Sequence, residues 1–202
     1  MKLYCSSNSP YARKVRIMAL ELGIRDQFEM LDTNPRDPAN DLYDVNPLRK
    51  IPTMITSNGD VILDSPVICE YLNEVYGQGQ FLPKQQDEVW NMRSLIALCH
   101  GVLDAGMSVR VENTRKPELQ SEGWKKHQLA TVQRGLAELE KQSEHFENEF
   151  NLLAIGLVST LGWLYFRFDH IDWLETNPKM RAWYTKISER ASVKATVPGE
   201  LL

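Results

Sequence analysis

The stretch KIPTMITSNGDVILDSPVICEYL, residues 50–72, decides the fold of the N-terminal part of the chain. Its Asn-Gly pair lies between two β-prone runs, which is the strongest short-range signal for a β-hairpin. Asp64-Ser65-Pro66 follows directly, and a capping residue before a proline is typical of a helix start. Apolar residues at helical spacing then continue to Gly77. The stretch therefore predicts a hairpin followed by a helix.

The residues before the hairpin alternate between strand and helix patterns, and Ser9-Pro10 repeats the capped helix start. We expect a strand at 2–6, a helix at 10–22, a strand at 27–31, a polar loop, hairpin strands at 53–56 and 61–63, and the helix that ends at Gly77. A helical crossover makes its two strands parallel, whereas a hairpin is antiparallel. The N-terminal part is therefore predicted to be a small mixed α/β sheet of the order βαβ-ββα.

Beyond a Gly- and Gln-rich linker at 77–86 there is no strand-like alternation. Apolar residues at helical spacing predict helices within 89–103, 129–139, 151–166 and 180–187. The third is too uniformly apolar for a surface helix, so we expect it at the centre of its domain. The chain is thus predicted to form an α/β domain over 1–77 and an all-α domain over 87–202.

Composition excludes several classes of function. The 202 residues carry a net charge of −4 without a block of five like charges, which gives nucleic-acid binding no electrostatic support. Three widely spaced cysteines, Cys5, Cys69 and Cys99, argue for a reducing compartment. The uncharged run 151–166 is too short to span a membrane. We find no metal-ligand motif and expect no metal, no membrane partner and a cytoplasmic protein.

Two features remain as candidates for chemistry. The first is Lys50-Ile51-Pro52, because proline cannot donate to a strand ladder. A cis Ile51–Pro52 bond would turn the backbone N–H and C=O of Ile51 outward, whereas a trans proline at a strand edge would be purely structural. The second is the pair of Ser-Pro helix starts, since helix N-termini attract anions. Either the two helix starts and the strand edge together hold an extended anionic peptide, or Ser9 and Ser65 are plain helix caps.

The segments NSPYARKVRI (8–17), NPLRKIPTMI (46–55) and NGDVILDSPVICEYL (58–72), followed by an all-helical remainder, resemble the cytosolic glutathione S-transferase family. The resemblance extends over essentially the whole chain. It implies a thioredoxin-like N-terminal domain, a helical domain that contributes the electrophile site, glutathione as co-substrate, and a bacterial member with serine at the catalytic position.

The resemblance also implies a set of glutathione-binding residues. Ile51 with Pro52, in a cis-proline loop, would pair with the cysteinyl backbone of glutathione. Asp64 and Ser65 match the acidic-Ser/Thr pair that holds the γ-glutamyl end, and Lys50 would approach the glycyl carboxylate.

Ser9 occupies the position at which different classes of the family place a catalytic Tyr, Ser or Cys. We therefore expect Ser9 to cap its helix and also to face the bound thiol. Tyr4, Tyr11 and Cys5 are rivals for this role, although Cys5 lies on the first strand and is expected to be a small buried hydrophobe.

The expected activity is attack of the glutathione thiolate on a small electrophile or peroxide, with Met107 and Arg110 in the electrophile pocket. The alternatives are a non-catalytic binding or regulatory protein with the same fold and a glutathione-dependent isomerase or dehalogenase. The resemblance also implies a homodimer, with the helix that contains Asp104 at the interface.

Two positions depart from the family pattern. The central helix of the second domain usually has a Ser/Thr cap followed three residues later by Asp, whereas here Asn151 is followed by Ala154. The last helix often ends in Arg-Pro, and here the sequence is Arg190-Ala191. Both concern folding more than chemistry.

Overall fold

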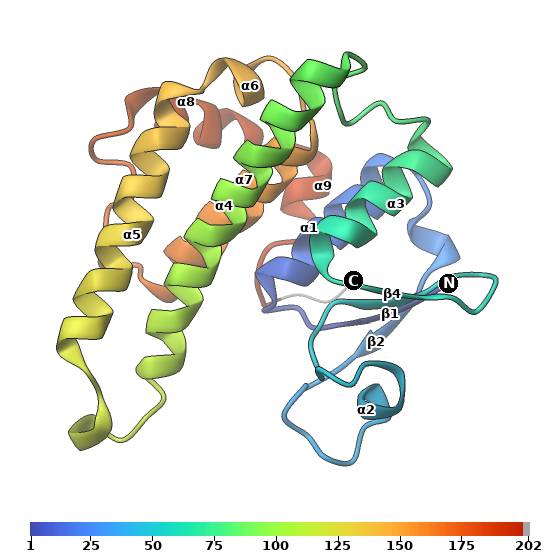
Figure 1. The fold of residues 1–202 in the computed structure, drawn as a ribbon, viewed down its shortest axis with the longest axis horizontal. Helices are drawn as coiled ribbons and strands as arrows, with labels where there is room; N and C mark the ends of the chain where they lie inside the picture. Colours follow the sequence, from blue (N-terminus) through green and yellow to red (C-terminus); the bar gives the residue numbers. More distant parts are fainter. Residues whose placement is uncertain (200–202) are drawn as a thin grey trace. The chain divides into compact units, whose positions relative to one another are not determined.

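The computed structural model describes residues 1–199, and its N-terminal part contains a four-stranded sheet (Figure 1). The elements of this part are β1 (Lys2–Cys5), α1 (Pro10–Glu21), the 3-10 helix η1 (Arg25–Gln27), β2 (Glu29–Asp32), α2 (Leu42–Val45), β3 (Thr53–Ile55), β4 (Val61–Leu63) and α3 (Ser65–Gly77). The strand order is β2-β1-β3-β4, with β1 and β2 parallel and the other two pairs antiparallel. The predicted mixed sheet is confirmed.

The strand register brings three connecting segments to one end of the sheet. Tyr4 of β1 pairs with Thr53 of β3, and Thr53 pairs with Leu63 of β4. The chain therefore leaves β1, enters β3 and leaves β4 at the same end. That end collects residues 6–9, 51–52 and 64–65, which include the predicted site residues.

Helices α1 and α3 lie side by side over the sheet, and α2 lies on its other side (Figure 1). Val15 and Met18 of α1 are fully buried, as are Ile68 and Leu72 of α3 and Met54 of β3. Because burying each such side chain contributes about 1.5–3 kcal/mol, this shared apolar layer holds the two helices to the sheet.

The second part of the chain is helical, as predicted. Its elements are α4 (Gln86–Glu112), the 3-10 helix η2 (Pro117–Leu119), α5 (Glu122–Lys141), α6 (Glu144–Glu147), α7 (Leu152–Arg167) and α8 (Pro178–Ile187). Helix α4 packs against α5 and α7. Residues 152–161 of α7 are all buried, which confirms the central position that its uniform apolarity predicts.

Two glycines set the closeness of the helix contacts in this part. A Cβ atom at Gly135 of α5 would lie 2.2 Å from Cγ2 of Val102 on α4. A Cβ atom at Gly106 of α4 would lie 2.9 Å from Cδ2 of Leu164 on α7. The helices thus approach each other at positions that have no room for a side chain.

Helix α4 is long and apolar. Among the described residues it is the one helix whose length and apolar composition would suffice to cross a bilayer. Buried helices of globular proteins meet the same criterion, and α4 has a face packed against α5 and α7.

The chain divides into two compact units, residues 1–81 with the segment from Glu189, and residues 82–188. The predicted helical domain included that last segment, whose final residues 200–202 lie outside the described part. It packs with the first unit because Arg190 donates to the Glu21 carboxylate, with Nε 2.8 Å from Oε1. Arg13 of α1 also donates from Nη2 to the carbonyl oxygen of Val193, 3.1 Å away.

The two departures from the family pattern have structural explanations. Asn151 caps α7, since its Oδ1 accepts from the Ala154 N–H at 3.0 Å. Arg190-Ala191 does not end the last long helix, because α8 stops at Ile187. Arg190 instead precedes the short helix α9 (Ala191–Lys194) and pairs with α1.

Candidate functional site

The peptide bond between Ile51 and Pro52 is cis, as predicted. Pro52 directly precedes β3, which begins at Thr53. Within residues 1–199 neither the N–H nor the C=O of Ile51 has a hydrogen-bond partner. Because backbone groups in folded proteins are nearly always paired, this half-buried residue offers one donor and one acceptor to a ligand.

Asn46 and Thr53 hold this proline loop in place. The buried Asn46 amide donates from Nδ2 to the Lys50 carbonyl (3.1 Å) and to Oγ1 of Thr53 (2.9 Å), and its Oδ1 accepts from the Leu48 N–H. The Thr53 hydroxyl donates to the same Lys50 carbonyl at 2.8 Å. Sequence reasoning missed Asn46, although Asn before proline is a known turn signal in which the side chain bonds the backbone two residues on.

The start of α3 lies at the same end of the sheet. Its N-cap is Asp64, whose Oδ1 accepts from the Ser65 N–H at 2.7 Å and whose φ of 70° lies in the left-handed region. Ser65 is therefore the first helical residue, and not a cap as the repeated Ser-Pro pattern suggests. The reason is local: the Asp64 carboxylate takes the first helix N–H and leaves the serine inside the helix.

The Ser65 side chain is the clearest sign of a ligand. The residue is 0% exposed, and its Oγ has no hydrogen-bond partner among the described residues. A buried hydroxyl without a partner costs about 1–3 kcal/mol. At the N-terminus of a 13-residue helix, this donor suits an anionic group.

Ser9 is the N-cap of α1, as predicted. Its Oγ accepts from the Ala12 N–H at 3.2 Å, and the residue is half-buried. A hydroxyl has one donor and two acceptor positions, so this bond leaves the Ser9 O–H able to donate.

Two of the rivals of Ser9, Tyr4 and Cys5, are less suited to activate a thiol. Burial raises the pKa of Tyr4, and its hydroxyl donates to Oδ2 of Asp41 at 3.0 Å. Burial raises the pKa of the Cys5 thiol to about 11, so Cys5 is a neutral buried hydrophobe as expected. The ring of Tyr11 lies 5.6 Å from the Lys14 ammonium.

The remaining predicted residues are placed as follows. Lys50 is exposed at the proline loop, next to the cis bond. Met107 and Arg110 lie in the last two turns of α4, and both are partly exposed. In the part of the chain that the structure describes, no group of three or more His, Cys, Asp or Glu side chains is placed to hold a metal ion.

Comparison with family models assigns both parts of the chain. A model described as the N-terminal domain of glutathione S-transferase matches residues 8–75. A model described as the C-terminal domain of glutathione S-transferase matches residues 122–186.

Individual proteins agree with this assignment. The uncharacterized GST-like protein YibF of Escherichia coli K12 is 31% identical over 201 residues, which cover 98% of either chain. A glutathione transferase family member from Pseudomonas fluorescens Pf-5, crystallised with bound glutathione, is 34% identical, with a TM-score of 0.93 and coverage of 98% of this chain and 99% of that one.

A further structure from P. fluorescens Pf-5, with bound S-(propanoic acid)-glutathione, is 34% identical, with a TM-score of 0.89 and coverage of 99% and 100%. The predicted fold class, a thioredoxin-like α/β domain followed by an all-α domain, is confirmed by these likenesses and by the four-stranded mixed sheet. The chain belongs to the glutathione S-transferase family.

Proposed function

We propose that the protein binds glutathione at the end of the sheet formed by residues 6–9, 51–52 and 64–65. The observation that carries this proposal is the buried Ser65 hydroxyl, which has no partner within residues 1–199 and lies at the same end of the sheet as the Ile51 backbone, likewise unpaired there. Glutathione would pair its cysteinyl backbone with Ile51, place its γ-glutamyl end at Asp64 and Ser65, and direct its glycyl carboxylate to Lys50. The bound glutathione of the P. fluorescens relative supports this assignment.

The proposed activity is transfer of glutathione to a small electrophile or peroxide after the thiol becomes a thiolate. A free thiol has a pKa of about 8.5, and a decrease of about two pKa units requires roughly 2.7 kcal/mol of preference for the anion. A hydrogen bond from Ser9 to the thiolate, worth about 1.5–3 kcal/mol, has the required size. The cap geometry supports this role because it leaves the Ser9 O–H free to donate.

A non-catalytic glutathione-binding protein is the second candidate, since YibF has no assigned activity. A dehalogenase or isomerase would share the same glutathione site. We further propose a cytoplasmic homodimer, which sedimentation at micromolar concentration tests directly, since the monomer is 23.2 kDa.

The decisive experiment uses retention on immobilised glutathione, followed by titration of bound glutathione through the ultraviolet absorbance of its thiolate. We expect retention, elution by free glutathione, and a titration midpoint below that of free glutathione. Ser9→Ala should raise that midpoint and lower turnover, whereas an unchanged midpoint and rate would reduce Ser9 to a helix cap. Failure to bind glutathione would reject the whole proposal.

A further inference from the structure

Helices α4 and α7 of the helical unit run in the same direction and touch at two successive levels. At the first, Sγ of Cys99 lies 3.6 Å from Oγ1 of Thr160. At the second, a Cβ atom at Gly106 would lie 2.9 Å from Leu164 and 3.2 Å from Trp163. Since residue numbers rise on both helices from the first level to the second, the two helices run in the same direction.

One turn further along lie two arginines. Arg110 follows Gly106 by four residues, and Arg167 follows Trp163 by four, so each lies on the face of its helix that carries the contact. Both occupy the last turn of their helix and are partly exposed. Burial lowers the pKa of Arg167, and the positive charge of Arg110 lowers it further, which agrees with two neighbouring cations.

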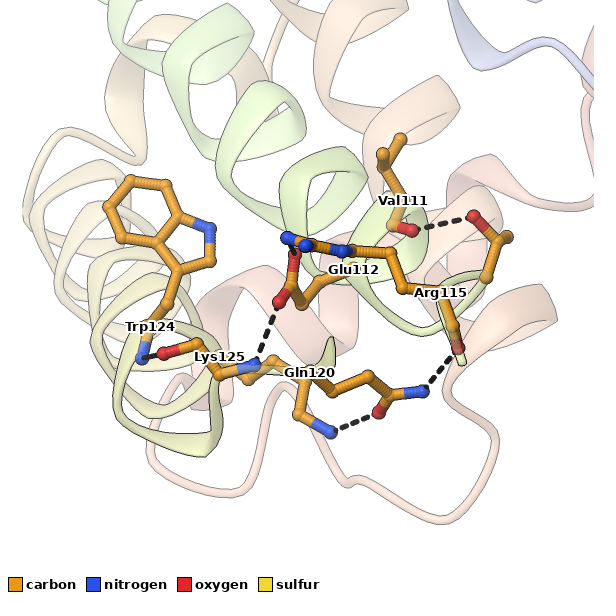
Figure 2. Close-up of polar contacts among 8 residues, drawn as sticks. Val111, Glu112, Arg115, Gln120, Trp124 and Lys125 are labelled. Atoms are coloured by element: carbon orange, nitrogen blue, oxygen red, sulfur yellow. Dashed lines mark hydrogen bonds and ion pairs between the residues drawn. The ribbon is translucent and has the colours of Figure 1, made fainter. Parts of the chain in front are cut away.

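Neither arginine has a counterion within residues 1–199. Arg110 and Arg167 form no ion pair or hydrogen bond there, and Nε of Arg167 is buried without a partner. The helix dipole favours a cation at each C-terminus but does not supply a partner for this N–H. Two carboxylates close by in the chain are engaged elsewhere: Glu112 accepts from the Ser121 N–H and from Arg115 (Figure 2), and Asp172 pairs with Arg181. The exposed Asp169 lies 3.7 Å from Nδ1 of His170.

We propose that Arg110 and Arg167 bind the carboxylate of an acidic electrophile. Two like charges without a counterion repel each other, and a carboxylate bound to the partly exposed guanidinium groups of both arginines would relieve that repulsion. Guanidinium groups are well matched to this anion in geometry. The assignment of the anion to an electrophile rests on the proposed function, whereas binding of the anion does not.

A matched pair of chloronitroarenes tests the proposal. Both 4-chloro-3-nitrobenzoate and 1-chloro-2,4-dinitrobenzene react with a thiolate by the same step: the C–S bond forms, the C–Cl bond breaks, chloride leaves with the electron pair, and the thiol proton passes to solvent. Only the first carries a carboxylate. We expect Arg167→Gln and Arg110→Gln each to lower the ratio of kcat/KM for the benzoate to kcat/KM for the neutral compound about tenfold, the loss typical of one charge-assisted hydrogen bond.

Arg134→Gln is the matched control, because Arg134 is an exposed arginine of α5 whose side chain, within residues 1–199, bonds only Thr131. It should change neither rate. Arg167→Lys keeps the charge and should retain part of the preference for the benzoate. Circular dichroism and the melting temperature exclude misfolding as the cause of a loss.

Calorimetric titration with 4-chloro-3-nitrobenzoate in the absence of glutathione separates the two proposals. Binding that weakens in the two glutamine variants supports the anion site even if neither arene is turned over, an outcome that would refute the assignment of the anion to an electrophile. Equal losses for both arenes, or benzoate binding unaffected by the substitutions, would overturn the anion site.

Discussion

Helices α7 and α3 begin in opposite ways. At the start of α7, Asn151 accepts from the Ala154 N–H with Oδ1 and donates from Nδ2 to the His145 carbonyl at 2.7 Å, so both ends of its amide are used. At the start of α3, the Asp64 carboxylate takes the Ser65 N–H, and the buried Ser65 hydroxyl has no partner within residues 1–199. The polar groups of Asn151 at the start of α7 are thus paired within the protein, whereas the Ser65 hydroxyl at the start of α3 is not paired within residues 1–199.

This difference separates structural polar groups from functional ones. Around Gly106 and Gly135 the helical unit is closed by direct contact that leaves no space for a methyl group. The first unit keeps unpaired polar groups at one end of its sheet, at Ile51 and Ser65. Substitutions in the closed region should therefore change the free energy of unfolding, and substitutions in the open region should change ligand affinity.

The largest expected effect is that of Gly135→Ala. The added Cβ would lie 2.2 Å from Val102, and overpacking of this kind costs about 1–3 kcal/mol of unfolding free energy, with the upper end expected here. Thermal and urea unfolding measure the change. Gly123→Ala, on the same helix with nothing within 4 Å, is the control and should be neutral or stabilising by up to about 1 kcal/mol. Equal effects of the two variants would contradict the close contact.

Ser65→Ala should lower glutathione affinity by roughly 1–3 kcal/mol through loss of one hydrogen bond to a charged group. It should leave the unfolding free energy of the unliganded protein unchanged or slightly higher, because the hydroxyl has no partner to lose. Calorimetric titration with glutathione and thermal unfolding give the two quantities. A large stability loss with unchanged affinity would reverse the comparison.

Asn151→Ala should have the opposite signature. Loss of the cap costs about 0.5–2 kcal/mol of stability, and loss of the bond to His145 adds to it. Glutathione affinity of the folded protein should stay at the wild-type value, since this helix start lies in the other unit. Asn151→Asp, which keeps the accepting oxygen, should recover part of the loss.

The smallest effect concerns Glu21. Burial by itself would raise the pKa of Glu21, but the hydrogen bonds from Arg190 and Ser192 and the charge of Arg190 outweigh it, so the folded-state pKa is lowered. A lowered carboxyl pKa stabilises the folded state above the unfolded pKa of about 4.3, and this is lost as pH falls through the folded value. Amide exchange in residues 191–195 should therefore quicken below about pH 4 relative to the rest of the unit.

Glu21→Gln removes this pH dependence and the ion pair with Arg190, whose side chain is partly exposed whereas that of Glu21 is 12% exposed. A partly solvated pair of this kind contributes about 1 kcal/mol. Exchange in residues 191–195 that remained equally pH-dependent in Glu21→Gln would show that another group anchors the C-terminal segment.

The pattern of the sequence predicted most of the first unit because its signals are local. The Asn-Gly pair specifies the hairpin, and the adjacent residues Ser9 and Pro10 specify the start of α1. The cis bond at Pro52 was predicted from the proline that precedes β3 together with the family resemblance. In the second unit, the uniform apolarity of α7 predicted its buried position. The Ser-Pro pattern indicated a cap at Ser65, whereas the cap is Asp64, because that cap depends on a backbone φ of 70° that the residue types do not specify.

What the sequence by itself determined is the order of elements, the mixed sheet and the segments that meet at its end, because turn residues, caps and apolar spacing act over a few neighbours. Only the tertiary structure decided that the C-terminal segment belongs to the first unit, and that the charge of Arg110 lies near enough to Arg167 to lower its pKa. The bonds from Arg190 to Glu21 and from Arg13 to Val193 join residues about 170–180 positions apart. Contacts at such separations depend on how whole helices pack, and no local pattern encodes them.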